Sequence, residues 1–208
     1  MYWLGSFLFW IYRPAIGFIT LAGLFIYLFL KKRYPSAFLL RKIFFSLIIF
    51  LLFSALFFSF LNAYYWSKRP ITQKLLPPFT PIVYVIRYSF QYYWWEVLMT
   101  ILVSGIVLYT MRTLNKKFHY IFFYQEEPYL AAIGILLTGW PNCLFFFLAV
   151  ICLALILHLV ILIKHLLSHR KLNYFRLSFL NFWLPAALLT IIISGILNKW
   201  NLVNQFRI

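Results

Sequence analysis

The chain has 208 residues, 65% of them hydrophobic and only 11% charged, and its formal net charge is +16. Soluble domains are roughly half apolar and a quarter charged, so this composition excludes a soluble globular protein and predicts a single integral membrane domain over residues 1–208. The 19 Lys and Arg residues are scattered over short loops and are not gathered in one soluble segment. We therefore expect them to bind anionic lipid headgroups and not nucleic acid.

Apolar segments follow one another along the whole chain, and a membrane span needs about 20 such residues. Arg13 and Pro14 interrupt the first apolar run and no basic stretch precedes it, so the pattern is not that of a cleaved signal peptide. Residues 79–94 contain Arg87 and Gln91 and are either a short span or an interfacial helix. The sequence thus predicts an all-α polytopic membrane bundle with about six to seven spans. Apart from the ambiguous segment, the expected spans are residues 15–30, 43–66, 95–111, 129–140, 142–163 and 179–198.

The basic loops predict which span ends share a side of the membrane, because Lys and Arg accumulate on the cytoplasmic side. If residues 79–94 cross the membrane, the basic loop 31–42 lies opposite the loop 112–128. If residues 79–94 lie flat, these two loops share one side. In both arrangements the loops 112–128 and 164–178 lie together on the side richer in cations, which we expect to be cytoplasmic.

Glu126 and Glu127 are two of only three acidic residues, and the chain contains no aspartate. They stand directly before the short apolar segment 129–140. The positive end of a helix dipole favours carboxylates, and Pro128 suits the first position of a helix. One interpretation is that the glutamates cap this helix; the other is that they form a catalytic centre. The first is favoured because acidic first turns are common.

Three histidines lie on one predicted helical face. His158, His165 and His169 are spaced at i, i+7 and i+11. The last two have the spacing of metal ligands on a helix, but no HExxH motif, cysteine or carboxylate accompanies them, so we expect no metal site. His158 is predicted to form a hydrogen bond to another helix. The chain has no P-loop and no GxGxxG motif, so no cofactor is expected.

Residues 125–134 read Gln-Glu-Glu-Pro-Tyr-Leu-Ala-Ala-Ile-Gly. This stretch resembles the motif Gly-Asp-x-Lys-Leu-x-Ala-x-x-Gly of the type IV prepilin peptidase (leader peptidase) family. As in that family, a Gly-Trp pair at residues 139–140 and a long span at 142–163 follow. The resemblance is usable over about residues 95–190. Upstream, Asn62 followed by a basic turn resembles the position of the family's first catalytic aspartate.

The resemblance implies an intramembrane aspartic peptidase, in which two carboxylates share the acid and base roles. In this chain Asn62 stands at the first aspartate position, and Glu126 stands at the second, or Glu127 if the register slips by one. The family's four-cysteine zinc loop is absent from this sequence. We therefore expect a divergent, non-catalytic relative in a bacterial inner membrane that binds hydrophobic leader segments or pilus-assembly proteins. If it does cleave, Glu126 and Glu127 are the two carboxylates.

Two other functions fit the composition. High Phe, Tyr and Lys content with few glycines suits a structural subunit of a larger membrane complex, encoded in an organelle. A small transporter is the third hypothesis, with the helix broken at Trp140-Pro141 and with His158 lining a path.

Overall fold

The computed structural model describes residues 19–20, 22–23, 36–68, 70–118, 123–168 and 182–199. Every element in this part of the chain is helical, which confirms the all-α class. The expected span 15–30 lies largely outside the described residues, and His169 lies outside them altogether. The elements are α2 (Ala37–Ser67), α3 (Pro70–Gln73), α4 (Ile82–Ser89), the π-helical η1 (Phe90–Trp94), α5 (Trp95–Lys117), α6 (Glu127–Thr138), α7 (Cys143–Ser168) and α8 (Trp183–Lys199).

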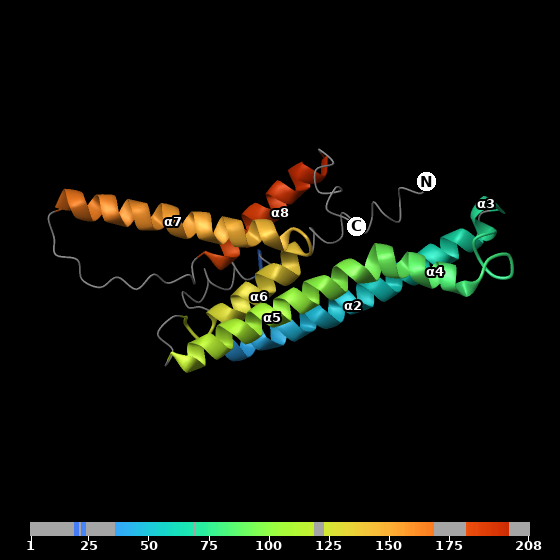
Figure 1. The fold of residues 1–208 in the computed structure, drawn as a ribbon, viewed down its shortest axis with the longest axis horizontal. Coiled ribbons are helices and arrows are strands. Elements are labelled where there is room, and N and C mark those ends of the chain that lie inside the picture. The colour runs from blue at the N-terminus through green and yellow to red at the C-terminus, as the bar shows by residue number, and fades with distance from the viewer. Residues whose placement is uncertain are drawn as a thin grey trace.

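Helix α2 and the run α4–η1–α5 form a long antiparallel hairpin (Figure 1). The Ser36 hydroxyl caps α2 by accepting a hydrogen bond from the Leu39 N–H at 3.4 Å. Pro81 lies just before α4, so no proline interrupts the continuous helical run Ile82–Lys117. The sequence prediction separated this run into segments at 79–94 and 95–111, and that division is wrong. Polar Arg87 does not break the helix because its side chain is exposed.

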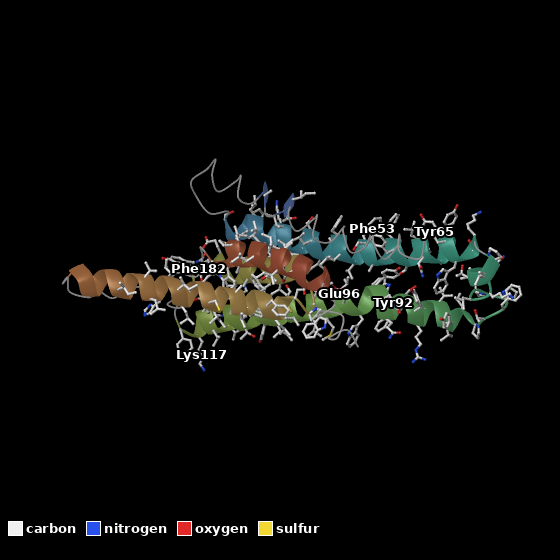
Figure 2. The ribbon with its side chains drawn as sticks, turned by 90° about the horizontal axis from the view of Figure 1, so that it is seen from above. Phe53, Tyr65, Tyr92, Glu96, Lys117 and Phe182 are labelled. Carbon is white, nitrogen blue, oxygen red and sulfur yellow. The ribbon has the colours of Figure 1, made fainter. Side chains whose placement is uncertain are left out.

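The hairpin brings the start of α2 and the end of α5 to the same end of the bundle. Figure 2 shows Lys117 near this end and Tyr65 towards the opposite end. The basic segments that flank these two helix ends, 31–42 and 112–128, therefore share a side where the structure describes them. The shared side matches the arrangement in which the two loops lie together, but that arrangement placed residues 79–94 flat, whereas residues 82–94 continue into α5. The shared side contradicts the seven-span arrangement, which placed the two loops on opposite sides.

Helix α6 is the centre of the fold. It contacts α2, α5, α7 and α8, and all 12 of its residues are buried. Small side chains let the neighbouring helices approach closely, as is common in membrane bundles. At Gly134, an added Cβ atom would overlap the Phe146 ring of α7. The sequence therefore places glycine where the Phe146 ring of α7 packs against α6.

A tight turn separates α6 from α7. Gly139 has φ 74° and ψ 168°, a backbone conformation that is essentially restricted to glycine. The Trp140 N–H donates a 2.8 Å hydrogen bond to the Thr100 hydroxyl, which fastens the turn to α5. Pro141 lies in this turn, two residues before α7 begins at Cys143. Its position still ends the apolar run before the next helix begins.

Three described helices are long and apolar enough to cross a membrane: Ala37–Ser67, Ile82–Lys117 and Cys143–Val160. Helices α6 and α8 are shorter apolar helices. Large hydrophobic side chains cover the outer faces of α2, α5 and α7, where lipid would solvate them. The protein is therefore an α-helical bundle embedded in a membrane.

Candidate functional site

The two candidate carboxylates lie at the start of α6 and have different surroundings. Glu126 is half-buried, and its backbone carbonyl accepts hydrogen bonds from the N–H groups of Tyr129 and Leu130, both at 3.1 Å. Glu126 occupies the N-cap position of α6, as the capping interpretation predicted, but its side chain makes no capping hydrogen bond. Glu127 is only 1% exposed and belongs to the first turn, where the helix dipole favours a negative charge. Pro128 lies in the same turn, as predicted.

A pocket of about 480 Å³ opens beside these residues. It lies between the start of α2, the end of α5 and the start of α6. Its wall contains three cations and no carboxylate. We call it the basic pocket, and its lining residues are Ala37, Phe38, Arg41, Arg112, Asn115, Lys116, Gln125, Pro128 and Tyr129.

Two contacts shape the basic pocket. The Arg112 guanidinium lies 4.9 Å from the centre of the Tyr129 ring, a cation–π distance that joins α5 to α6. The buried Asn115 side chain accepts a 3.3 Å hydrogen bond from the Phe123 N–H. This bond ties the chain ahead of α6 to the last turn of α5 and so holds Gln125 near the pocket.

The basic pocket is not evident from the sequence. Its cations come from residues more than 70 positions apart, as the separation of Arg41 and Arg112 shows (112 − 41 = 71). The only indication in the sequence was the predicted membrane topology, because the pocket forms only if the basic segments 31–42 and 112–128 lie on the same side of the membrane. That arrangement was one of two left open, and only the continuous run Ile82–Lys117 decides between them.

Asn62 does not belong to this site. It follows Arg41 by 21 positions on α2 (62 − 41 = 21), which is about 31 Å along a helix axis at 1.5 Å per residue. The described structure therefore places Asn62 far along the hairpin from Glu126 and Glu127. Its Nδ2 atom is buried and has no hydrogen-bond partner among the described residues.

The histidines do not converge on a site either. The His158 side chain is exposed on α7, so the prediction that it bonds to another helix is wrong for the described residues. His165 lies in α7, and its side chain is outside the described part, as is all of His169. Among the described residues, no three or more His, Cys, Asp or Glu side chains form a cluster that could hold a metal.

No family model, curated protein or solved structure matches this chain. The similarity to prepilin peptidases therefore stays a prediction that depends on the motif around Glu126.

Proposed function

We propose that this protein is a non-catalytic membrane subunit that binds another membrane protein through the end of its long hairpin. The observation that carries the proposal is an exposed apolar surface at the end of the hairpin. The hairpin is longer than the bilayer is thick, so this surface lies outside the hydrocarbon. The separation of Asn62 from Glu126 supports a non-catalytic role, because a peptidase of the aspartic type needs two carboxylates around one water.

The hairpin is longer than the membrane core. Helix α2 has 31 residues and the run Ile82–Lys117 has 36, which correspond to about 46 Å and 54 Å, against roughly 30 Å of hydrocarbon. Arg41 and Arg112 mark one membrane surface, because cations flank spans there. Exposed Tyr65 lies 24 residues from Arg41 (65 − 41) and exposed Tyr92 lies 20 residues from Arg112 (112 − 92), near the second membrane surface, where both suit the aromatic belt (Figure 2).

The described residues between Lys68 and Ser89 lie past this aromatic belt, and we call them the hairpin tip. Several of their apolar side chains are largely exposed: Ile71 is 84% exposed and Val83 is 65% exposed. Exposed apolar patches outside the hydrocarbon favour association, at about 25 cal/mol per Å² of surface removed from water. Exposed members of this patch are Ile71, Phe79, Ile82, Val83, Tyr84 and Ile86.

The tip is held in a fixed arrangement and carries only positive charge. The Trp66 ring lies 4.7 Å from the Tyr88 ring, and the Thr72 hydroxyl donates a 3.2 Å hydrogen bond to the Trp66 carbonyl. These contacts hold α3 and α4 against the end of α2. Lys68 and Arg87 are exposed, and the sequence has no acidic residue between positions 67 and 95. The complementary partner is therefore a membrane protein with an apolar surface and acidic residues around it.

The resemblance to prepilin peptidases indicates which membrane and which kind of partner to propose. It favours a bacterial inner membrane and a pilus-assembly protein or prepilin-like leader as the partner, with a complex of an organellar membrane as the alternative. A leader segment is apolar, so it suits the same surface. The transporter hypothesis has less support, because the half-length helix α6 is completely buried among its neighbours.

The size of the assembly tests this proposal. The full chain, extracted from its own membrane in mild detergent, should migrate at a mass well above 25.0 kDa plus its detergent. Val83→Glu should return it to the mass of a monomer, because a new carboxylate opposes an acidic partner. Thr113→Glu is the matched control, since it adds the same charge at an exposed site at the other end of the hairpin. A monomeric wild-type chain, or equal loss in both variants, contradicts the proposal.

A cleavage assay tests the non-catalytic part separately. Membranes that contain the chain are mixed with a prepilin bearing an intact leader, and we expect no cleavage. The Glu126→Gln and Glu127→Gln variants are assayed in parallel. Cleavage by the wild type that either variant abolishes would identify a working peptidase with a glutamate centre.

A further inference from the structure

We propose that the basic pocket binds the phosphate group of an anionic phospholipid. Its chemistry fits any phosphate-bearing anion, and its position at the membrane surface favours a lipid headgroup as the source. Basic pockets between membrane helices on the cytoplasmic side are suited to anionic headgroups. This site is independent of the hairpin tip, which lies at the other end of α2.

The pocket is located where a headgroup would meet it. Arg41 lies in the second turn of α2, just before the apolar run 43–66 begins. Arg112 and Lys116 lie in the last turns of α5, just after the apolar run 95–111 ends. Arg41 and Arg112 therefore lie at the boundary between hydrocarbon and water, and Lys116 lies one helical turn, about 6 Å, further out. The rim residue Phe38 is exposed, and the Lys42 Nζ atom lies 4.5 Å from the centre of its ring, so a further cation lies beside the pocket.

Charge and geometry favour a phosphate over a neutral ligand. A guanidinium presents planar paired donors that match phosphate oxygens, and Arg112 is oriented by its contact with the Tyr129 ring. Lys116 and Arg41 reach the same volume from separate helices. Its size, about 480 Å³, is within the usual range of small-ligand sites.

The neighbouring carboxylates of Glu126 and Glu127 lower the positive potential in the basic pocket but do not reverse its sign. Glu127 is buried within the bundle and Glu126 is half-buried, and neither lines the pocket. The start of α6 contributes positive potential from the helix dipole towards Pro128 and Tyr129. The pocket wall itself therefore remains cationic.

Lipid titration of the full chain in detergent, followed by native mass spectrometry, tests the inference. Phosphatidylglycerol should bind at least about tenfold more tightly than zwitterionic phosphatidylcholine, because each of the three cations that line the pocket contributes about a fivefold factor. Arg112→Gln should weaken phosphatidylglycerol binding about fivefold, and Arg41→Gln, on a different helix, should do the same. The matched control is Lys117→Gln, which removes an exposed cation next to the pocket that does not line it, and it should change binding less than twofold.

Further measurements separate the possible ligands. Inorganic phosphate at millimolar concentration should not displace the lipid; if it does, the ligand is free phosphate and the lipid assignment is wrong. Equal weakening by Lys117→Gln and Arg112→Gln would mean diffuse surface attraction and would overturn the site. Equal binding of the two lipids would also overturn it. The thermal unfolding midpoint of each variant shows that it is folded, and the two arginine variants on separate helices keep the test decisive if one does not fold.

Discussion

Helices α6 and α7 are neighbours in the chain and both are almost wholly apolar, yet their environments are opposite. Every residue of α6 is buried, whereas α7 exposes large side chains along most of its length. The difference lies in side-chain size, because α6 presents Ala131, Ala132 and Gly134, and α7 presents mainly Leu, Ile and Phe. In a membrane, apolarity shows only that a helix avoids water. Small residues indicate which helix faces protein.

The strongest test of this comparison is to enlarge the α6 surface. Gly134→Leu should destabilise the protein by about 3 kcal/mol, at the upper end of the range for overpacking, because the new side chain overlaps the Phe146 ring. The thermal unfolding midpoint in detergent measures the effect. Gly105→Leu is the matched control, since Gly105 lies on α5 with open space around it, and it should change stability little. Equal effects would mean that α6 does not pack as described.

A second test removes the same side chain from each helix. Ile133 on α6 is 0% exposed, and Ile156 on α7 is 58% exposed. Ile133→Ala should cost about 2 kcal/mol, at the lower end of the range for core truncations, because lipid would solvate the methyl groups if the helices separated. Ile156→Ala should cost less than about 0.5 kcal/mol, as for other surface changes. If the two variants unfold at the same temperature, the outward face of α7 is covered by protein.

The sequence predicted the elements better than it predicted their contacts. The all-α class and the short helix at 129–140 followed from hydropathy alone, because the apolar run sets the length of a membrane helix. The sequence did not predict that residues 79–94 join 95–111 in one helix. Arg87 interrupts the apolar pattern, but an exposed arginine does not interrupt the helix itself. That single error left the membrane side of the loop 31–42 undecided.

The candidate site could be predicted only in part. Glu126 and Glu127 were correctly placed at the start of a helix, since Pro128 and the apolar run identify that boundary. The basic pocket was missed because it depends on the return of α5 beside α2, a long-range arrangement that no local pattern encodes. The separation of Asn62 from the glutamates has the same cause. Motif similarity aligned these positions in sequence but carried no information on their distance.

The smallest expected effect concerns the hydrogen bond between α5 and α6. The Ser104 hydroxyl donates a 3.1 Å hydrogen bond to the Ala132 carbonyl across the interface, and such bonds contribute about 0.6 kcal/mol on average in membrane proteins. Ser104→Ala should lower stability by about that amount, because the Ala132 carbonyl keeps its place in the α6 helix and Ser104 loses only the added contact. Ser54→Ala is the matched control, since the buried Ser54 hydroxyl donates to the Leu51 carbonyl of its own helix.

The difference between these two serine variants isolates the interhelical bond, because both remove one buried hydroxyl from an apolar helix. We expect Ser104→Ala to lower the unfolding midpoint more than Ser54→Ala. The reverse order would show that the Ser104 hydroxyl does not stabilise the close approach of α5 to α6. Ala is small enough to preserve that approach, so the comparison separates side-chain size from hydrogen bonding as the reason why α6 is buried.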